Sequence, residues 1–510
     1  MAARFTWVAF ALPALIAAAL TIALLAFVET GDAIRIGIAV AIAEVVVGIA
    51  IVRTRQGPIP LLSPFGIFAI CHVAIFVVRP IYVLLYASSN NIFTETSYDG
   101  AYRQCLTIAG LGFIAASIGY AAFVHPRRAD LATTVETLPQ AQWRRLEPVL
   151  WAVVVIGLAL YGLYVAQVGI ADYWSSLLSG RSAQRDEALA ASSGYLLSGL
   201  QFTLGALLIM LFEAMAARRW AKSALVSAAL ALALFPQVAA GDRSVFIPVV
   251  VAVLAYLYYS GAAIFTFRRV ILWLPVLIVF GFVAPRVWRV QLAQGGSLLD
   301  ALLSSFTPQN LFANFVGGLD TAMSDAFALQ VAAQNDGQIL PAYGSTYLSA
   351  LVGVIPRALW PEKPETVDPY LNSILFPATH AQNIGFSFGI YSEPYLNFGL
   401  VGVVIVLGLV GAALALVSNL VHARTGLVSV FVVATVSGYL FPIVRGSVSF
   451  DSQRLLITDL PVAIAFVVAW GLGNRGGRSL EMPPGLERRS SFVPDRVPLG
   501  NAPAPQPERV

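Results

Sequence analysis

Long apolar runs separated by short polar stretches dominate the hydrophobic pattern of this chain. A membrane-spanning helix needs about 20 mostly apolar residues, because it rises about 1.5 Å per residue across a hydrocarbon core about 30 Å thick. Backbone polar groups in lipid must be paired within their own segment, so such runs are predicted to be helices. The pattern therefore predicts an all-α polytopic membrane protein. About twelve segments meet the length requirement: Phe5–Val28, Ala33–Val52, Leu62–Tyr86, Tyr102–Val124, Val149–Val168, Tyr195–Ala216, Ser223–Ala239, Val245–Phe265, Arg269–Pro285, Pro394–Leu420, Leu427–Val444 and Leu455–Leu472.

Composition narrows the class of protein further. Hydrophobic residues make up 58% of the 510 positions and charged residues only 11%, whereas soluble proteins carry about 25% charged residues. So few charges cannot cover a water-exposed surface of this size. Composition thus excludes a soluble enzyme, a disordered protein and a nucleic-acid binder. The two cysteines, Cys71 and Cys105, lack metal-ligand spacing, so neither a disulfide framework nor a zinc site is predicted.

The basic residues predict the orientation of the spans, because cytoplasmic loops carry an excess of Lys and Arg. The opposite loops begin with Glu29–Asp32 and Ser88–Gly100, neither of which contains a Lys or Arg. We therefore expect both termini in the cytoplasm, including the tail from Asn474, whose Pro-rich end reads as disordered. The predicted cytoplasmic loops contain Arg53, Arg55, Arg127, Arg128, Arg144, Arg145, Arg218, Arg219, Lys222, Arg268, Arg269 and Arg424.

One external loop is far longer than the other connections. We expect a polytopic membrane domain over residues 1–472, with this loop at about 286–392 between the ninth and tenth spans, and a cytoplasmic tail over 473–510. Within the loop, Leu298–Phe306 and Leu311–Gln334 show helical periodicity with apolar and polar faces, which suits helices lying on or dipping into the outer leaflet. Several prolines then predict an irregular but ordered segment. No internal repeat is visible, which weakens a transporter built from inverted repeats.

Several arginines occur in predicted external segments, against the general charge pattern. A charge at the outer end of a span is costly unless it is paired or binds a ligand. If these arginines converge, they form a cationic pocket suited to a diphosphate. Alternatively, each extends to the interface or pairs locally, as Arg243 would with Asp242. The external arginines are Arg243, Arg286, Arg289, Arg357, Arg445 and Arg454.

Two residues of the long loop are the candidates for acid–base chemistry. Glu393 precedes Pro394 where the loop enters a span, so it suits either a helix cap or a partly buried base. His380 can accept a proton near neutral pH, although it equally suits an ordinary loop position. Asp242 ranks third because Arg243 beside it favours the ionised form. Asp320 and Asp325 do not form a metal motif, and no bound metal is predicted.

Other residues have a weaker claim to function. Glu44 lies deep within a predicted span, whereas Arg79 and Glu213 lie toward span ends and are expected to extend to the interface. Aromatic rings in the external segment can stack on sugars or simply pack against the protein. These aromatic residues are Trp288, Tyr343, Tyr347 and Trp360.

Several of these segments, taken in order, resemble the oligosaccharide repeat-unit polymerases, or O-antigen polymerases of the Wzy type. The resemblance covers about Leu61 to Leu472. The segments that carry it are Arg79-Pro80-Ile-Tyr-Val, Ala240-Gly-Asp-Arg243, Tyr347–Ile355 with Pro356-Arg357-Ala-Leu-Trp360-Pro-Glu-Lys363-Pro364, Gly385-Phe-Ser387, Glu393-Pro-Tyr-Leu-Asn397-Phe-Gly399-Leu-Val-Gly402, and Arg445 with Arg454.

The resemblance implies a glycosyltransferase with a GT-C-like fold at the outer face of the bacterial inner membrane. Its substrates would be oligosaccharide repeats on undecaprenyl diphosphate, with membrane lipid around the carrier, and no cofactor or nucleic acid is implied. A repeat-unit flippase and a chain-length regulator would be possible partners. Glu393 or His380 would be catalytic. The residues expected to bind the diphosphate or glycan are Arg243, Arg289, Arg357, Arg445, Arg454, Asp242, Tyr347 and Asn397.

Two alternatives stay open at this point. A ligase that moves finished glycan from the same carrier would share the topology, the arginines and a loop histidine, although the Glu393–Gly402 segment favours a polymerase. A transporter of polysaccharide or carrier lipid would instead show repeat symmetry, charges at the midplane and short external loops, and the sequence offers little of these.

Overall fold

The computed structural model describes residues 33–90, 99–126, 135–179, 194–239, 242–261, 297, 299, 322–352, 360, 362–381, 385–423 and 425–476. Within these ranges all regular elements are helices, apart from one isolated bridge between Glu136 and Gly426. Nine of the described helices are long and apolar enough to cross a membrane. The described residues thus confirm an all-helical polytopic membrane protein.

Nine of the predicted spans coincide with these nine helices. The segment predicted at Val245–Phe265 is a shorter apolar helix, α12, which ends at Tyr259. The spans predicted at Phe5–Val28 and Arg269–Pro285 lie outside the described residues, as does the tail beyond residue 476. The predicted total of twelve therefore depends on α12 and on segments that the structure does not describe.

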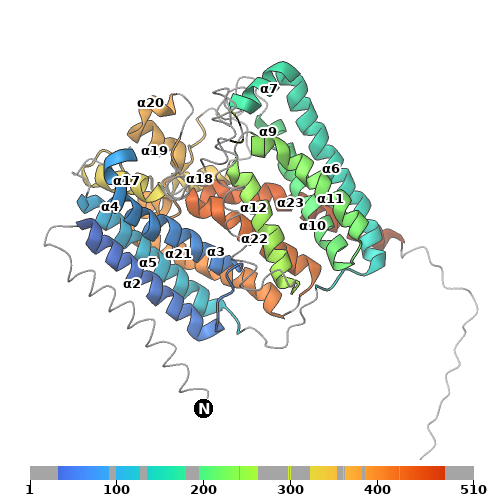
Figure 1. Cartoon of the computed structure of the whole chain (residues 1–510), viewed down its shortest axis with the longest axis horizontal. Helices are drawn as coiled ribbons and strands as arrows, with labels where there is room; N and C mark the ends of the chain where they lie inside the picture. Colours follow the sequence, from blue (N-terminus) through green and yellow to red (C-terminus); the bar gives the residue numbers. More distant parts are fainter. Residues whose placement is uncertain are drawn as a thin grey trace, which may run out of the picture.

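One bundle is built around α5 (Asp99–Phe123), which packs between α2 (Ala33–Gln56) and α21 (Ser392–Ala423) (Figure 1). Glycines let the backbones of α5 and α21 touch, because a Cβ at Gly119 would lie 2.0 Å from the carbonyl oxygen of Gly408. Small residues commonly permit such close approach between membrane helices. The bundle also contains α3 (Pro64–Val73), the π-helical turn η1 (Ala74–Val78) and α4 (Arg79–Asn90).

The second bundle contains most of the helices in the middle of the chain. Its core includes Trp143, Phe212 and Tyr256, all nearly inaccessible to solvent. Its long helices are α6 (Gln140–Val168), α10 (Gly199–Ala216), α11 (Trp220–Ala239), α12 (Arg243–Tyr259) and α23 (Val448–Gly476), with α7 (Ile170–Ser179) and α9 (Gly194–Leu197) as short connections.

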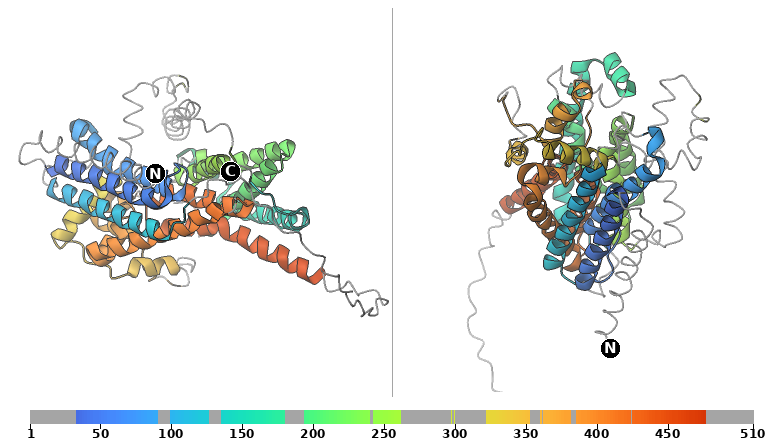
Figure 2. Two further views of the ribbon diagram at one scale, coloured as in Figure 1. Left: turned by 90° about the horizontal axis from the view of Figure 1, so that it is seen from below. Right: turned by 90° about the vertical axis from the view of Figure 1, so that its left-hand side faces the viewer.

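Helix α22 (Leu427–Arg445) joins the two bundles. Its first half contributes Val430 and Phe431 to the core of the second bundle, and its second half contributes Tyr439 and Leu440 to the core of the first. Figure 2 shows the orange and red helices α21–α23 running across both bundles. The end of α22 at Arg445 lies within electrostatic range of Asp242 at the start of α12 and Asp451 in α23.

Four helices of the long loop are described: α17 (Met323–Asn335), α18 (Ser345–Leu351), α19 (Val367–Leu375) and α20 (Pro377–His380). They lie together at one end of the bundles, near the start of α21 (Figure 1). Helix α17 contacts α5, η1 and α19 and buries residues on most of its sides. The described part of the predicted Leu311–Gln334 segment is therefore packed into the protein, whereas the rest of that segment and nearly all of Leu298–Phe306 lie outside the described residues.

Candidate active site

Two of the predicted arginines lie on either side of the turn between α22 and α23. Arg445 is the last residue of α22, and Arg454 lies two turns into α23. Between them, the carboxylate of Asp451 accepts a hydrogen bond from the amide of Ser447 at 3.2 Å and lies 3.6 Å from the Arg454 guanidinium. A Cβ at Gly446 would lie 1.9 Å from Asp451 Oδ2, so the turn closes around this carboxylate only because residue 446 has no side chain.

The start of α12 lies against this turn. Asp242 caps α12 by accepting a hydrogen bond from the amide of Ser244 at 3.0 Å and a second from its hydroxyl. Arg454 donates to the same Ser244 hydroxyl. Arg445 also lies within electrostatic range of Asp242, Asp451 and Arg454. The polar residues at the ends of α12, α22 and α23 thus form one connected network.

Glu393 enters this network from the start of α21. Its side chain is fully buried, and its Oε2 atom accepts a hydrogen bond from the amide of Ser449 at 3.1 Å. Two further contacts hold the residues just before Glu393. The Tyr391 hydroxyl lies 2.7 Å from His72 Nδ1, and the amide of Ile390 donates a hydrogen bond of 3.0 Å to the carbonyl of Val444. The structure therefore brings Glu393 to the first turn of α23, between Arg445 and Arg454 in the chain.

Asn397 and Tyr347 also lie beside Glu393, but they differ in their bonding. Asn397 is buried, and its side chain bonds the amide of Gly344 at 2.7 Å, the hydroxyl of Thr346 at 2.7 Å and the carbonyl of Glu393 at 2.8 Å. The first two of these bonds attach the start of α18 to α21, and the third lies within α21. The buried Tyr347 hydroxyl has no hydrogen-bond partner among the described residues and lies within electrostatic range of Glu393.

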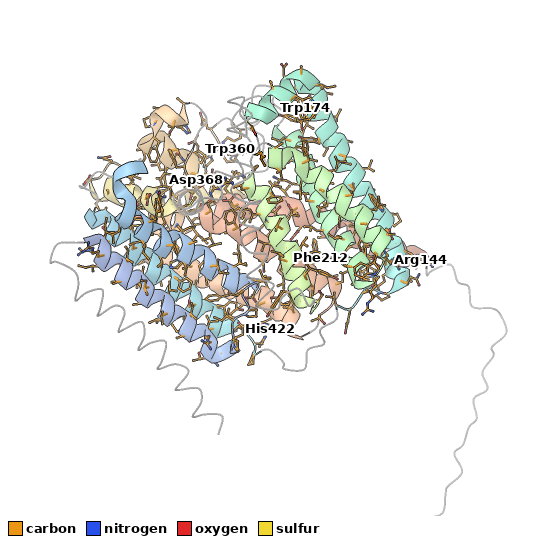
Figure 3. All side chains as sticks on the ribbon, in the orientation of Figure 1. Arg144, Trp174, Phe212, Trp360, Asp368 and His422 are labelled. Carbon is orange, nitrogen blue, oxygen red and sulfur yellow. The ribbon has the colours of Figure 1, made fainter. Side chains whose placement is uncertain are left out.

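Asp368, which the sequence analysis did not single out, belongs to the same site. It lies in the first turn of α19, within electrostatic range of Asp451, Glu393 and Arg445. Figure 3 labels it in the layer of loop helices that lies over the ends of α22 and α23. Desolvation of this carboxyl group, in a side chain that is partly exposed but whose Oδ1 atom is buried, and then the negative charges of Asp451 and Glu393, raise the pKa of Asp368 to about 8. Its acidic residue type was the only signal in the sequence, and several other loop residues share it.

The remaining predicted residues are placed differently. His380 ends α20, where its amide donates to the carbonyl of Phe376 at 2.9 Å. Arg243 is the first residue of α12 and is partly buried beside Asp242. Arg289 and Arg357 lie outside the described residues, as do Arg286 and Trp288.

Arg79 and Glu213 do not extend to the interface as expected. Arg79 is 4% exposed and forms a salt bridge of 2.7 Å with Asp325 on α17, whose other oxygen accepts a hydrogen bond from the Tyr102 hydroxyl. Glu213 is buried and faces Lys222 and Arg219 at 3.5 Å. Neighbouring helices cover both positions, so the two charged side chains are buried and pair with oppositely charged residues instead of reaching water.

The charges of the described site are mixed rather than purely cationic. Asp451 and Asp242 accompany the arginines, and Glu393 and Asp368 complete the acidic side of the site. Within the described ranges, no group of three or more His, Cys, Asp or Glu residues is arranged to hold a metal ion. The arrangement combines guanidinium groups, which suit phosphate oxygens, with buried carboxyl groups, which suit proton transfer from a hydroxyl.

Comparison with known proteins gives one match. The family model described as O-antigen polysaccharide polymerase Wzy matches residues 19–471. No curated protein and no solved structure matches the chain. The matched region spans most of the sequence and contains all of the residues placed in the site above.

Proposed function

Because the chain belongs to the O-antigen polysaccharide polymerase Wzy family, we propose that it joins oligosaccharide repeat units carried on undecaprenyl diphosphate at the outer face of the bacterial inner membrane. The family acts on lipid-linked oligosaccharide repeat units in membranes. The observation that carries the proposal is the meeting of Arg445, Arg454 and buried Glu393 at the ends of three helices, beneath the loop helices.

The arginines serve the leaving group in this proposal. When the growing glycan moves from its carrier to the next repeat, the bond between the anomeric carbon and the diphosphate breaks, and negative charge develops on the diphosphate. Preorganised cations lower the energy of such a transition state. Asp451 and Ser244 hold the Arg454 guanidinium in place before substrate binds. We assign the same task to Arg243 and Arg445 and, outside the described residues, to Arg289 and Arg357.

The acceptor is a sugar hydroxyl, which must lose its proton as it attacks the anomeric carbon. A carboxylate within reach of the hydroxyl accelerates this step by about 10²–10⁴-fold. We assign Glu393 as the first candidate, because it is buried at the arginine network with Oε1 free of hydrogen-bond partners among the described residues. His380 is the second candidate, on α20 of the same loop. Tyr347, Asp242 and Asn397 would bind or position the glycan.

One reconstitution experiment tests the proposed function. Purified full-length protein is incubated with undecaprenyl-diphosphate-linked repeats, and the products are separated by size. A ladder of lengthening, carrier-linked glycans is the expected result. Transfer of one finished glycan to a different lipid acceptor, with no ladder, would point to a ligase. Movement of unchanged repeats across proteoliposome membranes would point to a transporter.

A further inference from the structure

Asp368 occupies a position that the surrounding contacts define closely. The Asn372 side chain donates hydrogen bonds of 2.7 Å to the carbonyl oxygens of Asp368 and Phe386, and it accepts one of 2.8 Å from the amide of Phe386. These bonds clamp the first turn of α19 to the segment that leads into α21. The amide of Phe388, in that segment, bonds the Asp368 carboxyl group itself. Asp368 is therefore attached to the stretch of backbone that positions Glu393.

The same segment also touches the end of α22. The amide of Ile390 donates to the carbonyl of Val444, the residue before Arg445, at 3.0 Å. Phe388, Ile390 and Glu393 follow one another within a few residues, so α19, α21 and α22 meet at this point. The charged groups that face Asp368 come from all three neighbouring helices: Glu393 from α21, Arg445 from α22 and Asp451 from α23.

Three buried polar atoms in this region have no hydrogen-bond partner among the described residues. They are Asp368 Oδ1, Glu393 Oε1 and the Tyr347 hydroxyl. Buried polar groups are nearly always hydrogen-bonded, because leaving one unpaired is energetically costly. Glu393 interacts electrostatically with both other residues, so the three atoms share one region. Such a gathering of unmet donors and acceptors fits a ligand rich in hydroxyl groups, as a sugar is.

We propose that Asp368 is a further acid–base residue of this site and that it, in place of Glu393, accepts the proton of the acceptor hydroxyl, while Glu393 holds a neighbouring hydroxyl of the same sugar. This inference rests on the proposed function. In the step, the acceptor oxygen bonds to the anomeric carbon of the donor, and the carbon–oxygen bond to the diphosphate breaks with its electron pair. The hydroxyl proton passes to the Asp368 carboxylate and then to solvent, so no oxidant, metal or further reactant is needed.

The proposal predicts a distinct pH dependence. Because the pKa of Asp368 is raised to about 8, the group is mostly protonated at neutral pH and becomes a base as the pH rises. The wild-type rate should therefore rise with pH in proportion to the ionised fraction and level off above about pH 8. Asp368→Asn should lose about 10²–10⁴-fold in rate and lose this rise. The variant should fold, because an amide resembles the protonated carboxyl group in shape and charge.

The test measures initial rates of chain growth from below to above pH 8 for the wild type, Asp368→Asn and Glu393→Gln. Asp336→Asn is the matched control, because Asp336 is an exposed loop-side carboxylate. Glu393→Gln should be slow but keep the rise with pH. The proposal would be overturned if Asp368→Asn kept near wild-type rates and the rise with pH. It would also be overturned if the wild-type rate did not rise with pH, and this second outcome can be read even if the variant fails to fold. Absence of any ladder from the wild type would instead contradict the proposed function.

Discussion

The side chains of Arg445 and Arg454 are held in place by the residues around them. Arg454 is bonded to Ser244 and lies 3.6 Å from Asp451, and Arg445 shares the same acidic surroundings. The guanidinium groups are therefore held in fixed positions, whereas an arginine on an open surface would move freely. Fixed charge is what stabilises a transition state at no cost in reorganisation.

Removing either guanidinium should slow polymerisation without preventing expression. Arg445→Ala and Arg454→Ala are each expected to reduce the rate of chain growth by about 10²–10³-fold, the usual cost of losing one preorganised charge-stabilising group. Ladder length in the reconstituted reaction measures the effect. Arg144→Ala is the matched control, because Arg144 is exposed at the far end of α6 and should leave the ladder intact (Figure 3). Full-length ladders from both variants would contradict a role of these arginines in binding the diphosphate.

The two sequence-based candidates for the base can be separated by substitution. Glu393→Gln should fold and lose most of its turnover, since the amide keeps the hydrogen bond from Ser449 but offers no negative charge. His380→Ala should lose little, because Glu393 and not His380 lies in the arginine network. Initial rates of chain growth decide between them, with Glu136→Gln as the control at an exposed side chain. A dead His380→Ala variant beside an active Glu393→Gln variant would reverse the ranking.

At the scale of the helix, α21 is not the continuous span that its hydropathy predicts. The chain leaves helical geometry at Phe398 and Gly399, and Gly399 has a φ of 62°, which favours glycine. The break separates a first short stretch that carries Glu393 from the long apolar helix that crosses the membrane. The Asn397 side chain supports the backbone at this break, because it accepts a hydrogen bond from the amide of Gly344 and donates one to the hydroxyl of Thr346.

Close packing of α21 against α5 should be sensitive to a single methyl group. A Cβ at Gly411 would lie 1.9 Å from the carbonyl oxygen of Ala116, so Gly411→Ala must push the helices apart. We expect a destabilisation of about 1–3 kcal/mol, seen as a lower melting temperature of the purified protein. Gly162→Ala in α6 is the matched control, because a Cβ there meets nothing within 4 Å and alanine favours the helix. An unchanged melting temperature for Gly411→Ala would contradict this packing.

At the scale of the whole molecule, the described arrangement separates the site from the basic loops. The loop helices and the site residues lie at one end of the bundles, whereas Arg144 lies at the opposite end of α6 from α7 (Figure 3). The excess of basic residues in the other loops predicts that their side faces the cytoplasm. The candidate active site would then face the compartment outside the inner membrane.

Cysteine labelling in intact cells tests this orientation. Leu340→Cys, at a residue 70% exposed between α17 and α18, should react with a maleimide that cannot cross membranes. Arg144→Cys should react only after the cells are permeabilised. The background replaces Cys71 and Cys105 by alanine, so that the introduced thiol is the one labelled. The reverse pattern would place the candidate active site on the cytoplasmic side.

Hydropathy and charge alone predicted most of the architecture. Nine spans were located, and Glu393 was singled out where the long loop enters a span. These features follow from local physics, because a run of apolar residues must be shielded from water wherever it folds. Arg445 and Arg454 were singled out for a related reason, since a charge at the outer end of a span is costly unless it is paired or binds a ligand.

Only the tertiary structure decided which polar residues meet. Arg79 pairs with Asp325, 246 positions away in the chain, and Asp368 joins Glu393 only because Asn372 and Ile390 hold three helices together. No local pattern distinguishes Asp368, whose Oδ1 atom is buried among charged groups of three helices, from the exposed Asp336. A membrane span can be recognised from its own residues, because its apolar side chains must be shielded from water whatever the rest of the chain does. A site depends on contacts between distant segments, and packing alone establishes those.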